Sequence, residues 1–265
     1  METRLCLEYE PHPVKRGYTD HILWVDLTAG RIADRTLPPE FKEKYVGGRG
    51  YALKLIWDET TARTRYDSPE NLLVMAGGPL CNEPRFPGTG KFIVGTISPL
   101  TDTFVDSNIG GHFAPLLKQC GFDALVLTGL ADREVILCVD GDRGVIEILE
   151  APAFNPEEDW GALTYGEALL RWYNGGEPDE NVAAVVNGEG SLHARFGIIN
   201  SLFYDPRRKR IRSKQAGRGG TGTVMRTKGV RAVIVRSTLA KVNANRPADE
   251  QGVKEAGALL KKVVS

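Results

Sequence analysis

The stretch AGRGGTGTVMRTKG, residues 216–229, decides which fold class the chain can adopt. Its core from Gly217 to Gly222 satisfies the fingerprint G-x-G-x-x-G of dinucleotide-binding folds. That fingerprint requires a strand immediately before it, a helix after it and an acidic residue about 20 positions further on. The preceding residues, DPRRKRIRSKQ, look like a basic loop, and the later segment KVNANR contains no carboxylate. Two of the three conditions fail, which disfavours a dinucleotide-binding α/β fold.

A basic run precedes this glycine turn and continues into it at Arg218. Its members are Arg207, Arg208, Lys209, Arg210, Arg212 and Lys214. Such runs are usually solvated surface loops, and that is the simplest interpretation. A glycine turn that opens a helix, however, presents free N–H groups and the positive end of the helix dipole. With fixed cations beside it, such a turn makes a site for a phosphorylated ligand.

A second glycine turn, FPGTGKF (residues 86–92), ends by delivering Lys91. A Walker A loop needs G-x-x-x-x-G-K-[ST], but Arg85 stands at the first glycine position and Phe92 follows the lysine. No hydroxyl is available there for magnesium, which disfavours a nucleoside triphosphatase. An ordinary β-turn and a phosphate contact from Lys91 both remain open.

A third candidate is DSNIGGH, residues 106–112, which leads into an expected helix. Asn is favoured at helix starts, so capping is the simplest role for Asn108. His112 is expected near the start of that helix, without a catalytic role.

The overall charge disfavours nucleic acid and membrane surfaces as partners. Lys and Arg together number 34, as do Asp and Glu, so no net field attracts a polyanion. No apolar run approaches the roughly 20 residues that span a bilayer. The amino-terminal METRLCLEYEPHPVKRG lacks the apolar segment of a signal peptide, which predicts a cytoplasmic location.

Residue types that bind metals are scattered along the sequence. The cysteines include no C-x-x-C pair, which argues against a zinc knuckle or a contiguous iron–sulfur motif; they are Cys6, Cys81, Cys120 and Cys138. The histidines are equally dispersed, at His12, His21, His112 and His193. The sequence therefore predicts that this chain alone does not readily assemble a buried metal cluster.

The order of expected elements favours an α+β fold with mostly antiparallel sheets rather than repeated βαβ units. Residues 21–27 and 32–37 predict a hairpin around a TAGR turn. Further strands are expected at 72–77, 92–96, 124–128, 134–139, 145–149, 182–186, 196–200 and 232–235. Helices are expected at 38–45, 50–59, 112–120, 165–173 and 248–264, with a short one that ends at 228. Residues 1–18 look like an arm, and residues 201–214 look like a loop.

Five segments, taken in order, resemble the N-terminal domain of the tungsten-containing aldehyde ferredoxin oxidoreductases. They are WVDLTAGRI (24–32), YVGGRGYALKLIWDE (45–59), DSPENLLVMAGGPL (67–80), TGKFIVGTISPLTDTFVDSNIGGHFAPLLKQCGFDALVLTG (89–129) and AGRGGTGTVMRTKGVRAVIV (216–235). The resemblance covers roughly residues 19–236, and the shared order makes it far more specific than any single motif.

This resemblance implies an α+β base of two mostly antiparallel β-sheets with flanking helices, on which a bis-pyranopterin cofactor of tungsten, or molybdenum, lies. It divides the chain into an arm (1–18), a cofactor-binding domain (19–240) and a C-terminal helix (241–265). That helix is either a tether to a partner or an ordinary surface helix.

The resemblance also implies that the glycine turns meet the pterin phosphates. Lys91 and Lys214 fall where the family has arginines near the pterin, and Arg218 and Gly219 lie in the adjoining turn. Lysine keeps the charge of arginine but loses its bidentate fork, so a different phosphate contact is expected. Arg226 replaces a small residue of the family's usual VMGSK.

A bridging magnesium ion is implied as well. Asn108 matches an asparagine whose backbone holds that ion, and the backbone carbonyl of Gln215 faces it in the family. Gly110 follows in the same cradle. The resemblance implies no catalytic residue in this chain.

Members of the family are much longer than this chain, and their later domains supply iron–sulfur cysteines and catalytic acids. The resemblance therefore implies a subunit of a split oxidoreductase, whose larger partner carries a [4Fe-4S] cluster, with further electron-transfer subunits in a cytoplasmic hetero-oligomer. The implied chemistry interconverts aldehydes and carboxylic acids, or acts on acyl thioesters, with ferredoxin-type electron transfer.

Two other functions stay open. One is a non-catalytic binding or assembly module of a larger redox complex. The other is a nucleic-acid binder that uses residues 207–214, which the balanced charge and the scarcity of aromatics beyond Phe203 and Tyr204 disfavour.

Overall fold

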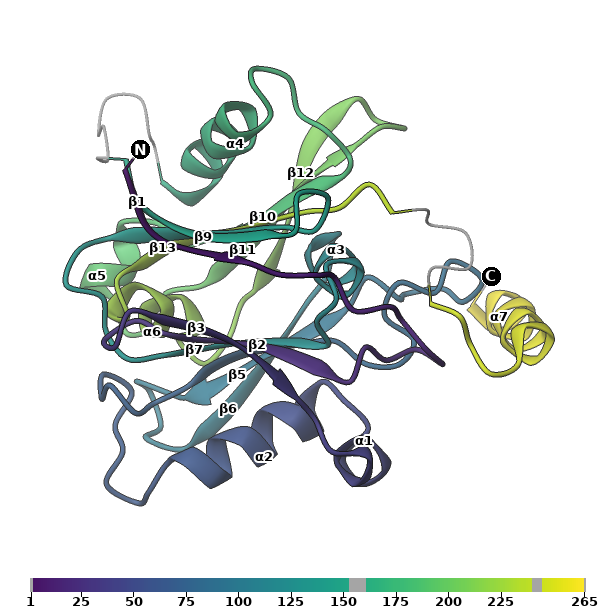
Figure 1. Ribbon diagram of the computed structural model, residues 1–265, viewed down its shortest axis with the longest axis horizontal. Helices are drawn as coiled ribbons and strands as arrows, with labels where there is room; N and C mark the ends of the chain where they lie inside the picture. Colours follow the sequence, from purple (N-terminus) through teal and green to yellow (C-terminus); the bar gives the residue numbers. More distant parts are fainter. Residues whose placement is uncertain (1, 153–160, 240–244, 265) are drawn as a thin grey trace.

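The computed structural model describes residues 2–152, 161–239 and 245–264. These residues form two stacked β-sheets with helices between and outside them (Figure 1). The larger sheet has the order β1–β9–β8–β13–β10–β11–β12, with bounds Thr3–Glu8, Val145–Glu150, Val135–Asp140, Val230–Arg236, Val182–Val186, Ile199–Asp205 and Arg210–Ala216. The smaller sheet has the order β3–β2–β7–β4–β5–β6, with bounds Arg31–Thr36, His21–Asp26, Ala124–Thr128, Leu73–Ala76, Phe92–Ile97 and Phe104–Ile109.

Helices cover both outer faces and fill part of the space between the sheets (Figure 1). The helices of the described residues are α1 to α7, with bounds Pro39–Tyr45, Arg49–Glu59, Phe113–Gln119, Ala162–Tyr173, Gly190–His193, Thr221–Thr227 and Glu250–Val264. Helices α1 and α2 cover the smaller sheet and α4 covers the larger one. Helices α3 and α6 contribute to the core between the sheets, and α7 lies at one side of the molecule (Figure 1).

The central strands are continuous apolar runs in the sequence because both of their faces are buried. In β8, Val135, Leu137 and Val139 belong to the core between the sheets, whereas Ile136 and Cys138 face the core under α4. Successive side chains of a strand point to opposite faces, so a strand buried on both faces has no polar positions. Strand β7 divides its side chains between two cores in the same way.

The predicted fold class is confirmed, because most strand pairs of both sheets are antiparallel. The parallel pairs are β8 with β13 and β2 with β7, among the strands described here. In the described ranges, no helix combines the length and apolar character that crossing a bilayer requires.

Three strands differ from the sequence predictions. The expected arm contains β1, which pairs with β9. The expected loop at 201–214 is a hairpin, because β11 continues to Asp205 and pairs with β12. The segment before α3 contains β6, which pairs with β5. The expected C-terminal helix is present as α7, while the division into arm, domain and tether stays a prediction.

Candidate functional site

The two sheets meet along their edges at β6 and β12. β6 is the last strand of the smaller sheet and β12 the last of the larger one, and the two are in contact. Two hydroxyl groups fasten the glycine turn after β12 to this junction: Ser107 Oγ accepts a hydrogen bond from the Arg218 amide (3.3 Å), and Ser98 Oγ donates one to the Gly219 carbonyl (3.0 Å). Sequence reasoning missed both serines because no motif marks them.

Close packing against protein atoms explains most of the glycines in the turn. Gly219 and Gly220 have φ values of +74° and +69°, which favour glycine. A Cβ on Gly219 would lie 2.5 Å from Val105 Cγ2, and one on Gly222 would lie 2.2 Å from the Ile198 carbonyl oxygen. Gly217 differs, since it is exposed and an added Cβ would meet nothing within 4 Å. The fingerprint spacing therefore serves the packing of this turn.

The structure corrects one reason for setting the dinucleotide fold aside. A strand, β12, does precede the glycine turn, so that condition is met after all. The strands on either side of α6 are nevertheless antiparallel to each other, because β12–β11, β11–β10 and β10–β13 are each antiparallel pairs. A βαβ unit requires parallel strands around its helix. The turn therefore does not belong to a dinucleotide-binding unit.

Lys91, Gly110 and Lys214 come together at the junction from three separate segments. A Cβ on Gly110 would lie 3.7 Å from side-chain carbons of both lysines. The side chains of both lysines and of Arg218 are exposed, and within the described residues they have no ion-pair partner. The nearby Asp106 is already paired with Arg49 at 2.9 Å. The junction thus presents uncompensated positive charge beside a residue without a side chain.

Asn108 and Gln215 lie on the two edge strands that form the junction. Asn108 is in β6, paired with Ile93, and not at the start of a helix; capping is therefore the wrong role for it. The residue at the start of α3 is His112. Gln215 is in β12, opposite Asn200. Edge strands keep part of their backbone N–H and C=O groups without a strand partner, so this backbone is open to a ligand.

Most of the basic run lies away from the junction. Ala216 lies six positions after Arg210 along β12, which is about 20 Å of extended strand. At the hairpin tip, Asp205 forms ion pairs with Arg208 and Arg212 at 2.8 and 3.4 Å. The hydrogen bond from Arg208 lowers the pKa of Asp205 to about 2. Only Lys214, at the far end of the run, reaches the candidate site.

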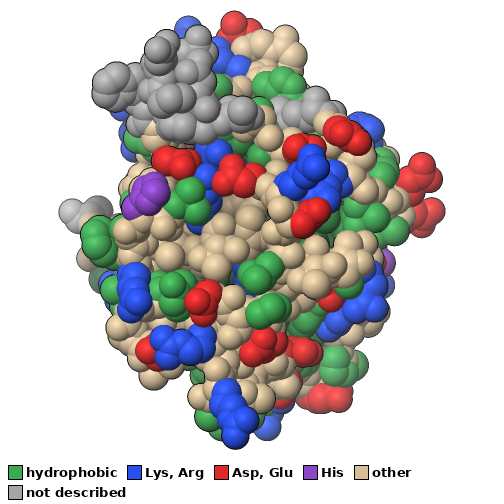
Figure 2. Space-filling model, turned by 90° about the vertical axis from the view of Figure 1, so that its left-hand side faces the viewer, with side chains coloured by type: hydrophobic (Ala, Val, Ile, Leu, Met, Phe, Trp, Pro, Cys, Tyr) green, Lys and Arg blue, Asp and Glu red, His purple; other side chains and the backbone are tan. Residues whose placement is uncertain are grey.

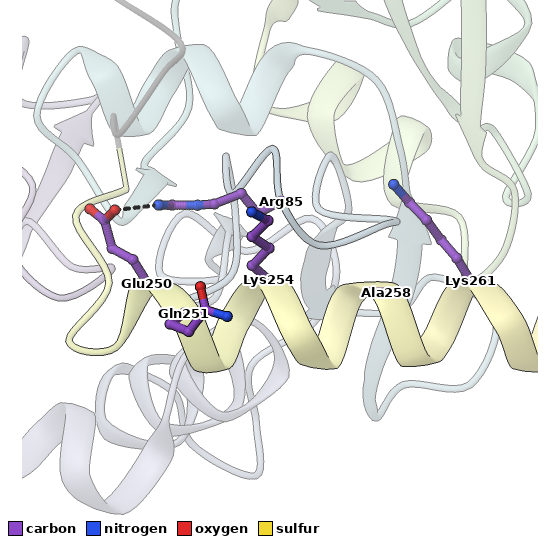
Figure 3. Close-up of a pocket in the computed structure, with 6 residues that line it drawn as sticks. All are labelled: Arg85, Glu250, Gln251, Lys254, Ala258 and Lys261. Carbon is purple, nitrogen blue, oxygen red and sulfur yellow. Dashed lines mark ion pairs between the residues drawn. The ribbon is translucent and has the colours of Figure 1, made fainter.

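Helix α7 packs on the loop that leads to Lys91. Arg85 in this loop forms ion pairs with Glu83 at 2.6 Å and with Glu250 of α7 at 2.9 Å. Figure 3 shows Arg85 extended toward Glu250, with Lys254 and Lys261 on the same side of the helix. A Cβ on Gly257 would lie 2.2 Å from the Arg85 carbonyl oxygen, so the helix touches the loop backbone there.

A shallow groove adjoins the glycine turn on the side of α5 and α6. Its volume is about 370 Å³, and small residues such as Gly188, Ser191 and Gly197 line it. The Gly222 amide donates to the Gly197 carbonyl at 2.9 Å, which joins the groove to the turn. Phe196, which also lines the groove, is 71% exposed. Figure 2 views this side of the molecule, and charged side chains surround a middle made largely of backbone and uncharged groups.

These features define a class: an α+β protein with a cationic, glycine-lined junction between two sheet edges. Residues 22–237 match the family model described as aldehyde ferredoxin oxidoreductase, N-terminal domain. The chain therefore belongs to the aldehyde ferredoxin oxidoreductase family and corresponds to its N-terminal domain.

Individual relatives agree with this assignment. A tungsten-containing aldehyde ferredoxin oxidoreductase of Pyrococcus abyssi is 32% identical over 220 residues, which are 83% of this chain and 33% of the relative. An aliphatic sulfonate oxidoreductase, WOR-like subunit, of Pyrococcus furiosus is 27% identical over 84% of this chain and 35% of the relative. The chain thus spans about a third of the length of these relatives.

A solved structure has the same fold. It is the active-site complex BamBC of benzoyl coenzyme A reductase with 1,5-dienoyl-CoA. The TM-score is 0.71 and the identity 30%, over 84% of this chain and 31% of the matched chain.

Proposed function

We propose that this chain holds a bis-pyranopterin cofactor of tungsten, or molybdenum, as one subunit of a hetero-oligomeric oxidoreductase. The observation that carries the proposal is the meeting of Lys91, Gly110 and Lys214 at a junction where neither lysine has an ion-pair partner among the described residues. Charge of this kind, beside backbone that a ligand can approach, suits the phosphates of such a cofactor.

The residues present fit the proposed cofactor. Lys91 and Lys214 would bind phosphate oxygens from the two sides of Gly110, and Arg218 would add a third positive charge. The backbones of Asn108 and Gln215 would supply oxygen ligands to a magnesium ion, which prefers such ligands. When bound, the metal–pterin group supplies the redox chemistry, and this chain orients it and neutralises its charge.

A larger partner chain completes the proposed enzyme. This chain spans about a third of the length of its relatives. Three of its cysteines are buried, and among the described residues the group of side chains close enough to hold a metal ion contains no cysteine. A [4Fe-4S] cluster and the catalytic acids therefore belong to the partner in this proposal. The exposed Phe196 and the groove beside the glycine turn are surfaces that such a partner would cover. Helix α7 is a second attachment point.

The proposed reaction is the interconversion of an aldehyde and a carboxylic acid, or chemistry on an acyl thioester, with electrons exchanged through a ferredoxin-type carrier. The support is the tungsten-containing aldehyde ferredoxin oxidoreductases among the relatives. The residues that the sequence predictions place at the junction are cations and backbone groups. In this proposal this chain therefore positions the cofactor, and the partner provides the catalytic groups.

Affinity purification of the tagged chain from its native host tests the proposal. We expect near-stoichiometric tungsten or molybdenum, an oxidised pterin derivative in the fluorescence spectrum, and a larger cysteine-rich chain in the mass spectrum. A stoichiometric partner without metal or pterin would instead indicate the assembly module. Absence of partner, metal and pterin together would contradict both functions.

A further inference from the structure

Two histidines and a carboxylate meet at the start of the β2–β3 hairpin. His21 Nδ1 lies 2.7 Å from Asp34 Oδ1, and His12 Nε2 contacts the other oxygen, Asp34 Oδ2. The two imidazole rings are stacked, with centroids 3.3 Å apart and an interplanar angle of 12°. One nitrogen of each ring and one carboxylate oxygen all lie within 4.8 Å of one another. Sequence spacing gave no sign of this cluster, which differs from the expectation that the histidines are dispersed.

The fold brings these residues together from three segments. In the β2–β3 register Leu23 pairs with Asp34, so His21 lies two residues away and on the same face of the hairpin. His12 comes from the segment before β2. The backbone of this segment packs closely on Gly121, because a Cβ added there would lie only 2.4 Å from the His12 amide nitrogen. The His12 ring is nearly perpendicular to that of the buried Phe122, with an interplanar angle of 80° and ring centroids 6.4 Å apart. This packing holds His12 against the hairpin.

We propose that His12, His21 and Asp34 form a binding site for a first-row divalent transition metal ion, of which Zn²⁺ is the representative. Imidazole nitrogen and carboxylate oxygen are preferred zinc ligands, and two histidines with one carboxylate form an established ligand set. The side chains are 27%, 19% and 27% exposed, so an ion and one or more waters can reach them.

The change needed to admit the ion is small. Two metal–ligand bonds of about 2.0–2.1 Å at a tetrahedral angle place their ligand atoms about 3.3 Å apart. The His21–Asp34 distance of 2.7 Å therefore opens by about half an ångström. The stacked rings also tilt apart so that both nitrogens point at one ion, with the remaining proton of each ring on its other nitrogen.

This site is separate from the cofactor junction. Both histidines precede residue 22, where the match to the family model begins. The metal would fasten the first segment of the chain to the β2–β3 hairpin. The proposal does not depend on the proposed function, and binding of Zn²⁺ alone is the test.

Titration of the full 265-residue chain with Zn²⁺, followed by calorimetry, measures the site. We expect one equivalent to bind and the melting temperature to rise when Zn²⁺ is added. Asp34→Asn and His12→Gln should each weaken binding at least about tenfold. His193→Ala, which removes an exposed histidine on α5, is the matched control and should bind zinc like the original chain.

Cobalt provides a readout that does not rely on the folding of the variants. Co²⁺ added to the original chain should give visible absorption typical of four-coordinate nitrogen and oxygen ligation, and Zn²⁺ should abolish it. Absence of stoichiometric zinc binding, or binding that both Asp34→Asn and His12→Gln leave unchanged, would overturn the proposal. Cobalt absorption typical of a fully hydrated ion would do the same.

Discussion

The backbone amide of Arg218 donates a hydrogen bond to the hydroxyl of Ser107, 3.3 Å away, and this bond joins an edge of one sheet to an edge of the other. Ser107 is in β6 and buried, whereas Arg218 opens the turn that follows β12. Every residue that the resemblance assigns to the cofactor lies within a few positions of β6, β12 or the start of β5. The candidate site therefore depends on how the two sheets are held together at their edges.

The first prediction concerns the glycine turn. Gly219→Ala should lower the free energy of unfolding by about 2–4 kcal/mol, because it adds a strained φ and a clash with Val105. Gly217→Ala is the matched control, since a Cβ there meets nothing within 4 Å. Urea denaturation of both variants measures the difference. Equal effects of the two substitutions would show that packing does not explain the glycine spacing.

Edge strands explain what the sequence could not predict about the fold. The strands missed were β1, β6 and β12, and each lies at the edge of its sheet. The central strands are buried on both faces, so their apolar runs marked them clearly. β12, with the sequence RIRSKQA, carries charges along an exposed edge and has almost no apolar alternation. Such charges protect edges from pairing with other chains, and they also hide the strand from pattern analysis.

The candidate site, too, was only partly predictable from local sequence. Local sequence marked Lys91 as the end of a glycine turn, and it marked Lys214 only as one member of a basic run. That both flank Gly110 depends on the register of β6 and β12, in two different sheets, which only the resemblance could anticipate. Of the His12–His21–Asp34 cluster, only His12 lies outside the stretch that the resemblance covers, and no spacing rule indicated the cluster.

The second prediction tests the cations at the junction. Lys91→Ala combined with Lys214→Ala should reduce tungsten or molybdenum in the purified complex several-fold, because two positive charges beside Gly110 are lost. The fold should be intact, since both side chains are exposed. Arg207→Ala with Arg210→Ala removes the same charge from the hairpin tip and is the control. Metal analysis and circular dichroism are the measurements, and equal metal loss in both double variants would argue against a local role.

The third prediction concerns α7. Gly257→Ala places a Cβ 2.2 Å from the Arg85 carbonyl oxygen, so α7 should separate from the loop before Lys91. Hydrogen exchange of the α7 amides should become roughly tenfold faster or more. Ala256→Ser changes an exposed neighbour on the same helix and should leave exchange unaltered. Protection that survives in Gly257→Ala would mean that this contact does not hold the helix.

The fourth prediction concerns Lys228, whose ammonium group is buried at the end of α6 and donates to the Gly129 carbonyl at 3.2 Å. Burial lowers the pKa of Lys228 from 10.5 to about 7, and Glu70 and Asp26 offset this only in part. From about pH 7 to 10.5 the unfolded chain therefore binds a proton that the folded chain lacks, and the free energy of unfolding rises with pH by up to about 1.4 kcal/mol per unit. Lys228→Met should remove this slope, most visibly between pH 7 and 9, and should stabilise the chain at neutral pH and below. Urea unfolding across that range measures it, with the exposed Lys261→Met as control. If the free energy of unfolding of Lys228→Met rose with pH as steeply as that of the original chain, Lys228 would be protonated in the folded state over this pH range.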